Sequence, residues 1–379
     1  MLDEYIAPTT IVLFLALQGT DRLLPIAWAI LTFGSLLTAL RGGIDFQRRV
    51  SPIEKGLGVA LAACLLSAAF GLDAQRSLLL SVPVLASLLL WLLIARGSHA
   101  QPRFFSVAMG LAFAAGLQSV CVLLAAQRHP EMPPADWVAD AGAAWLVVPN
   151  DMAWIACVLP LWAVMARGRS LLVMLGLLAG FLVLCAFMQS RTAAIVATAV
   201  ALSFASAYLG ARLRMLIWAA AAGVVILVSV VAFNAASMHA RLQLWAAAWS
   251  MFLDHPWSGV GIHNFVLAYR QYRPAAELID SRITPWPHNL PLEIAAECGL
   301  IGVFALFFLA GSLVRQAAAL WRTGIGSVHR AALVGLCGLA LLALVEASLL
   351  RQWFWLLGTA LCALLENNAQ FSGKQKNEQ

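Results

Sequence analysis

The sequence predicts an all-α, polytopic membrane protein with about twelve transmembrane helices and both termini in the cytoplasm. The 379-residue chain is 62% hydrophobic and only 11% charged, whereas a soluble domain has roughly 25% charged residues. A spanning helix needs about 20 mostly apolar residues, and twelve stretches come near that length. The distribution of Lys and Arg between their connections then indicates which side of the membrane each connection occupies.

The twelve apolar stretches are distributed along the whole chain, and the first and last are the shortest. They occupy residues 5–20, 23–40, 56–72, 77–95, 104–126, 145–166, 170–188, 192–210, 214–234, 289–314, 328–348 and 352–366. We therefore expect one transmembrane domain over residues 1–366, followed by a polar, disordered cytoplasmic tail at 367–379. A Pro-rich, acidic segment at 127–144 is expected to form an outer surface loop.

Connections rich in Lys and Arg alternate along the chain with connections that are poor in them. If the N-terminus is cytoplasmic, the inner loops and the tail hold 15 of the 24 Lys and Arg residues, the short outer loops hold 5, and one long outer loop holds 4. This bias follows the positive-inside rule. It also accounts for the net charge of +6, so no nucleic-acid partner is expected. The long loop at 237–287 is therefore expected to face the periplasm.

Seven cysteines fall singly in apolar segments and form no C-x-x-C pair. Neither a disulfide framework nor a zinc site is indicated. His255 and His263 lack partners at metal-ligand spacing, so no metal ion and no cofactor are expected.

His288 is the strongest candidate for a catalytic group. It follows Pro285 and Pro287 in the run TPWPHN, where the backbone is stiff. Asn289 can cap the helix that begins next, and Pro291 suits the first turn of that helix. A helix N-terminus favours a phosphate or a developing anion, and histidine suits proton transfer near neutral pH.

Two arginines are candidates for binding phosphate, because the guanidinium group matches phosphate geometry. Arg191 stands in QSRTAA, where Ser190 and Thr192 are candidate caps for the next helix. An arginine at a helix end can also simply extend to the lipid headgroups. Arg241 opens a run in which Leu242, Trp245 and Trp249 recur at helical spacing. That spacing predicts an amphipathic helix along the membrane surface with Trp anchors, and it leaves open whether Arg241 faces headgroups or a cavity.

Two further features surround this region. In DHPWSGVGIHNF, Gly259 or Gly261 is expected to supply a positive φ in a tight turn. Glu293 and Glu297 lie one turn apart on the same face of the helix after His288. Glu297 lies about 13 Å along that helix, so we expect it to hold a neighbouring element in place and not to act as the base.

These motifs resemble the O-antigen ligase and polymerase superfamily of bacterial envelope proteins. The matching signature is H-N-x-x-L-x-x-x-x-E-x-G-x-x-G, which begins at His288 and ends at Gly302. Upstream, R-x-x-x-W matches at 241–245, H-P-x-x-G-x-G at 255–261 and S-R-T at 190–192. The resemblance covers the second half of the chain, while the first half matches only in its number of helices.

The resemblance implies a metal-independent, inverting glycosyltransferase of the inner membrane, with a GT-C-like fold and a periplasmic active site. The donor would be a glycan on undecaprenyl pyrophosphate, and in a ligase the acceptor would be a sugar hydroxyl of lipid A–core. His288 would be the general base, and Arg191 and Arg241 would bind the pyrophosphate. Asn289, Glu297, His263 and Arg273 would support the site. A lateral groove would take the polyprenyl tail, and the enzyme would work as a monomer in membrane lipid.

Three alternatives remain beside an O-antigen ligase. An O-antigen polymerase would more often have two large Arg-bearing outer loops, and a protein-directed oligosaccharyltransferase of the superfamily often has a longer soluble C-terminal part. A flippase or transporter of lipid-linked glycans would be expected to place charges near the bilayer midplane. Here the charges collect at one membrane face, which favours the ligase.

Overall fold

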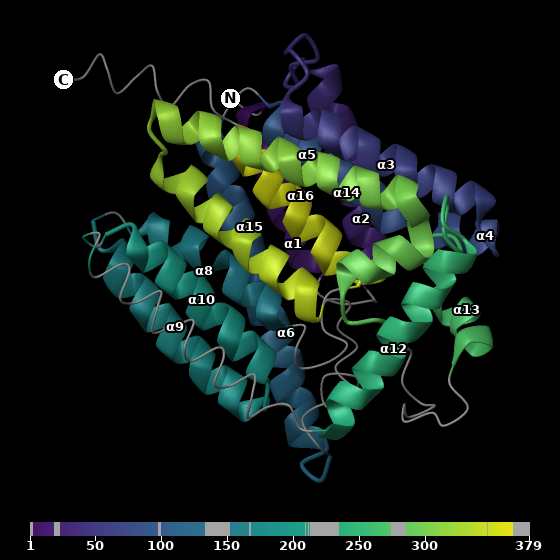
Figure 1. The fold of residues 1–379 in the computed structure, drawn as a ribbon. Coiled ribbons are helices and arrows are strands. Elements are labelled where there is room, and N and C mark those ends of the chain that lie inside the picture. Colours follow the sequence, from purple (N-terminus) through teal and green to yellow (C-terminus); the bar gives the residue numbers. More distant parts are fainter. Residues whose placement is uncertain are drawn as a thin grey trace.

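The computed structural model describes most of the chain, and its described residues are almost entirely helical (Figure 1). They comprise residues 3–18, 23–97, 100–132, 152–166, 168–208, 210, 212, 235–273, 286–346 and 348–366. Within these ranges the only strand-like pairing is one isolated bridge between Ile44 and Gly97. The expectation of an all-α protein is therefore confirmed for the described residues. The proposed tail at 367–379 lies outside them.

The first half of the chain forms six apolar helices in its described part. They are α1 (Asp3–Leu17), α2 (Leu24–Leu40), α3 (Pro52–Phe70), α4 (Ala74–Leu80), α5 (Val82–Ala95) and α6 (Ala100–Arg128). Ser51 and Glu54 form a reciprocal capping box at the start of α3, and Pro52 stands in the first turn. Such a cap satisfies backbone N–H groups that have no partner inside the helix.

The second half contains the site and the longest helix. Its elements are α8 (Ala153–Met165), α9 (Ser170–Phe187), α10 (Arg191–Ser206), α12 (Ala235–Asp254), α13 (Phe265–Tyr272), α14 (Leu290–Thr323), α15 (Ser327–Val345) and α16 (Gln352–Glu366). The predicted cap is present at α10, where Ser190 accepts from the N–H of Ala193. The helix predicted from the spacing of Leu242, Trp245 and Trp249 is present as α12.

Six helical segments are long and apolar enough to cross a membrane: Pro52–Phe70, Ala74–Ala95, Pro102–Arg128, Ser170–Phe187, Leu290–Arg322 and Ser327–Val345. Five further apolar helices, α1, α2, α8, α10 and α16, are shorter, at 10–17 residues. Every predicted span except 214–234 overlaps one of these helices, and 214–234 lies outside the described residues. The structure thus supports a multi-pass membrane protein, while the number of twelve spans stays a prediction.

The helices pack in groups that bring distant parts of the chain together. Helix α14 lies along α3, α1 lies against α2 and α6, and α15 packs against α8 and α10 (Figure 1). The two tryptophans Trp154 and Trp353 are among the largest fully buried side chains. Helix α12 packs against α14, and α13 lies beside α12 (Figure 1).

Connections that the charge pattern assigns to one side of the membrane contact each other. At the end predicted to be cytoplasmic, Arg48 donates to the backbone oxygens of Ala95 and Glu366 at 2.8 and 2.6 Å. At the opposite end, the N–H of Leu72 donates to the oxygen of Val260 at 2.9 Å. These contacts agree with alternating inner and outer connections, and the sidedness itself stays a prediction.

Candidate active site

His288 lies directly before the first turn of α14, at the helix cap. Asn289 is the N-cap residue, and its side-chain oxygen accepts from the N–H of Leu292 at 3.1 Å, while Pro291 occupies the first turn. His288 has a φ of +53°, a left-handed conformation that is costly for a residue other than glycine and persists where its surroundings demand it. The adjoining helix N-terminus carries a partial positive charge. His288 is therefore held where an anion can bind.

A carboxylate that the sequence analysis did not single out contacts His288. Glu346 follows the last residue of α15, and its side chain is only 3% exposed. Its Oε1 lies 3.1 Å from Nδ1 of His288, and its Oε2 lies 3.2 Å from Nη2 of Arg241. A carboxylate at Nδ1 favours the imidazole tautomer that carries its proton there, which leaves the lone pair on Nε2. Because the His288 side chain is 21% exposed, the imidazole can be reached from outside.

The side chain of Arg241 turns toward this buried carboxylate, which answers the question that its spacing in the sequence left open. One turn along α12, Nε1 of Trp245 donates to the backbone oxygen of Pro287 at 2.7 Å. Trp245 therefore braces the backbone that leads into α14, a role different from the membrane anchor expected of it. Trp249, which is 51% exposed, remains suited to the anchor role.

Glu297 is fully buried in α14 and binds the polar turn that follows α12. Its Oε2 accepts from the backbone N–H of His263, and its Oε1 accepts from the backbone N–H of Phe265, both at 2.8 Å. A buried carboxylate must find such donors to offset its loss of water. These are the contacts expected of a residue that holds a neighbouring element in place.

Glu293, one turn earlier and also fully buried, binds the turn between α15 and α16. It accepts from Oγ of Ser348 at 2.6 Å and from the N–H of Leu349 at 3.2 Å. The same turn carries Glu346. One face of α14 thus fixes two separate polar turns, and the second of them carries the carboxylate that contacts His288.

The glycines of the two motifs allow the turn after α12 to dock against a break in α14. Gly299 has a φ of +60° and interrupts the helix, and a Cβ there would lie 2.5 Å from the carbonyl of Trp257. A Cβ on Gly259 would lie 2.2 Å from the carbonyl carbon of Glu297. The N–H of Gly261 donates to the backbone oxygen of Glu297 at 2.9 Å. Both Gly259 and Gly261 have positive φ, as expected from the sequence.

His263 is buried within this docked turn. Its side chain is 1% exposed, and neither ring nitrogen has a hydrogen-bond partner among the described residues. Burial, together with the nearby Arg76 cation, lowers the pKa of His263 to about 4. The imidazole is therefore neutral at physiological pH and away from the exposed part of the site, so its contribution is structural.

Arg191 and Arg273 lie at the ends of two other helices, α10 and α13. Arg191 is an exposed residue that opens α10, two positions after Gln189, whose φ is +55°. No hydrogen bond or ion pair joins it to His288 or Arg241 in the described part of the chain. Arg273 is exposed at the end of α13. Glu346 thus joins Arg241 and His288, while Arg191 lies on α10, which packs against α15.

Sequence reasoning missed the residues at the α15–α16 turn. Besides Glu346, this turn carries Arg351, whose guanidinium carbon lies 4.4 Å from the ring centroid of Trp286. One signal could have indicated Glu346, because it is the only acidic residue between Gly326 and Leu365. An ionisable residue within an apolar segment is a functional candidate by default.

The fold and this cluster together define a multi-pass, all-α membrane protein with a polar site at one end of its helices. Residues 155–307 match the sequence model of the family described as O-antigen ligase. This match supports the O-antigen ligase superfamily, in agreement with the resemblance found in the motifs. The match contains Arg191, Arg241 and His288 and ends before Glu346. Comparison with curated proteins finds no match to the chain.

Proposed function

We propose that this protein transfers an O-antigen glycan from undecaprenyl pyrophosphate to a sugar hydroxyl of lipid A–core at the periplasmic face of the bacterial inner membrane. The family match supports a membrane enzyme of the O-antigen ligase and polymerase superfamily. The observation that carries the more specific chemistry is the contact of Glu346 with Nδ1 of His288. This contact orients the partly exposed imidazole so that it can act as a general base beside a helix N-terminus.

The reaction is a single displacement in which His288 activates the acceptor. As the hydroxyl oxygen attacks the anomeric carbon, its proton passes to Nε2 of His288, and the carboxylate of Glu346 stabilises the resulting imidazolium. The bond between the anomeric carbon and the pyrophosphate oxygen breaks, and its electron pair leaves with undecaprenyl pyrophosphate. Attack from the face opposite the leaving group inverts the anomeric configuration. No residue forms a covalent intermediate in this scheme.

Arg241 and Arg191 would bind the pyrophosphate and offset its charge as it leaves. Arg241 is 27% exposed, so part of its guanidinium group can face a ligand while Nη2 contacts Glu346. Arg191 opens α10, which packs against α15, the helix that ends beside Glu346. Positive groups that meet charge developing in the transition state raise the rate more than they tighten substrate binding.

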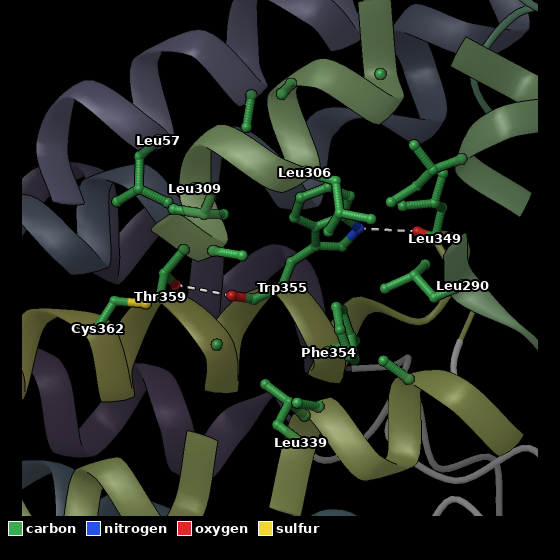
Figure 2. A pocket seen from close by; sticks show the side chains of 18 of the residues that line it. Leu57, Leu290, Leu306, Leu309, Leu339, Leu349, Phe354, Trp355, Thr359 and Cys362 are labelled. Carbon is green, nitrogen blue, oxygen red and sulfur yellow. Dashed lines mark hydrogen bonds between the residues drawn. The ribbon is translucent and has the colours of Figure 1, made fainter. Parts of the chain in front are cut away.

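An apolar cavity of about 620 Å³ supports a lipid-linked donor. Its lining comes from α3, α5, α14, α15 and α16, and it follows α14 from Leu290 to Leu313. Figure 2 shows Leu290 toward one end of the lining and Leu57 toward the other. Because Leu290 is two positions after His288, a long hydrocarbon tail in this cavity would have its head group near the proposed base. A polyprenyl chain is long enough to follow this path.

Deletion of the gene in its host, followed by gel electrophoresis of the lipopolysaccharide, tests the proposal. We expect core without attached repeats, and restoration by the wild-type gene but not by His288→Ala. Core that carries a single repeat would indicate a polymerase instead. Intact lipopolysaccharide with an unglycosylated pilin would indicate a protein-directed transferase. Failure to display the lipid-linked glycan on the outer leaflet would indicate a flippase.

A further inference from the structure

The ring of Trp286 connects His288 to a second charged residue. The imidazole centroid of His288 lies 4.7 Å from the ring centroid of Trp286, with 38° between the two planes. The guanidinium carbon of Arg351 lies over the same tryptophan at 4.4 Å. Trp286 and Arg351 are 6% and 8% exposed. A buried cation at this distance from an indole face is attracted by the ring, so the tryptophan is held from one side by a fixed charge.

The backbones that carry these side chains are themselves fixed. Trp245 donates to the oxygen of Pro287, next to Trp286. The N–H of Arg351 donates to the oxygen of Ser348, whose side chain is bound by Glu293 of α14. Hydrogen bonds therefore hold the backbone next to Trp286 and the backbone of Arg351. Such support is what holds a reacting group within a small distance of its productive position.

The α15–α16 turn reaches His288 by two routes. Glu346, after α15, contacts Nδ1 of the imidazole directly. Arg351, before α16, reaches the imidazole through the ring of Trp286. The same turn therefore contacts a ring nitrogen of His288 and also fixes the aromatic ring beside it.

We propose that Trp286 and Arg351 are positioning residues for His288. Arg351 fixes the indole, and the indole fixes the plane of the imidazole. This inference rests on the proposed function in one respect, because it takes His288 as the general base. The contacts themselves do not depend on which glycan or acceptor is used.

Purified full-length protein in detergent provides the test, with kcat and KM for glycan transfer measured separately. Arg351→Gln removes the group that stacks on the indole, so we expect kcat to fall by about tenfold or more while KM stays close to that of the wild type. Arg351→Lys keeps a charge but loses the planar stacking, so its kcat should lie between those of Arg351→Gln and the wild type. Trp286→Phe keeps a ring and should retain more activity than Trp286→Leu. The exposed Arg128, on the same predicted face, provides the control variant Arg128→Gln.

A second readout separates this inference from the proposed function. Diethyl pyrocarbonate modifies accessible imidazole, so the rate of His288 modification at one fixed pH, followed by mass spectrometry, reports how the ring is packed without requiring turnover. We expect faster modification in Arg351→Gln and Trp286→Leu, and the wild-type rate in Arg128→Gln. A wild-type rate in folded Arg351→Gln would overturn the inference. A changed rate together with an active His288→Ala enzyme would overturn the general-base role and leave the positioning contacts standing.

Discussion

The carboxylate of Glu346 lies 3.1 Å from Nδ1 of His288, across 58 positions of sequence. The other oxygen of the same carboxylate contacts Arg241. One buried acid thus connects the proposed base with a proposed phosphate ligand. A pairing of this kind sets both the tautomer of the histidine and the direction of the arginine, and the predictions below follow from it.

His288→Ala should lower the rate of glycan transfer by about 10²- to 10⁴-fold, because general-base catalysis typically contributes that much. The measurement is transfer in membranes that contain equal amounts of wild-type and variant protein. A loss of less than tenfold at normal protein levels would remove His288 from the role of base.

Glu346→Gln should lower kcat by about 10- to 100-fold, since a hydrogen bond to a charged group contributes about 1.5–3 kcal/mol. Glu131→Gln, at an exposed position, is the matched control, and equal behaviour of the two variants would contradict the pairing.

Arg241→Gln should reduce kcat/KM by about 10²- to 10³-fold, if the guanidinium offsets charge on the departing pyrophosphate. The kcat/KM of Arg241→Lys should lie between those of Arg241→Gln and the wild type, because lysine keeps the charge without the planar guanidinium group. Arg270→Gln changes an exposed arginine of α13 and should have little effect. The phosphate-binding role of Arg241 would be refuted by wild-type kinetics in folded Arg241→Gln.

Gly299→Ala should destabilise the protein by about 2–5 kcal/mol. Its φ of +60° disfavours a side chain, and the new Cβ would lie 2.5 Å from the Trp257 carbonyl. Gly311→Ala, in the same helix, meets no atom within 4 Å and should be neutral or stabilising by up to about 1 kcal/mol. Apparent melting temperatures in detergent distinguish the two, and equal temperatures would argue against the tight docking at Gly299.

His263 should make stability depend on pH. Its ordinary pKa is 6.5 and its pKa in the folded protein is about 4, so above pH 6.5 both states are neutral. Between pH 6.5 and pH 4 the unfolded state binds a proton that the folded state does not, and stability falls as the pH falls, by about 3 kcal/mol in total. His263 has a φ of +65°, a backbone conformation that asparagine tolerates. His263→Asn should therefore reduce the dependence of melting temperature on pH. His255→Asn, at an exposed position, should leave that dependence unchanged.

The sequence predicted the features that depend on local chemistry. Apolar length indicated the helices, Asn289 and Pro291 indicated the start of α14, and the glycines at 259 and 261 indicated a turn with positive φ. These features follow from neighbouring residues, so a single sequence contains them. The break at Gly299 was not predicted, because a glycine inside an apolar helix is also compatible with continuous helix.

Contacts between distant elements were harder to predict. Nothing in the spacing of α12 determines that Arg241 faces Glu346, because the partner lies 105 positions away. The stacking of Trp286 on Arg351 likewise requires the α15–α16 turn to lie over the start of α14. Such pairings depend on how helices pack, which hydrophobic periodicity alone does not determine.

The break in α14 at Gly299 also fixes the length of the helical segment that precedes it. His288 and Gly299 are 11 positions apart, and Glu293 and Glu297 must face two different turns from between them. One inserted or deleted residue would rotate everything beyond it by about 100° and carry at least one glutamate away from its turn. Changes in chain length are therefore expected to be excluded from residues 288–299.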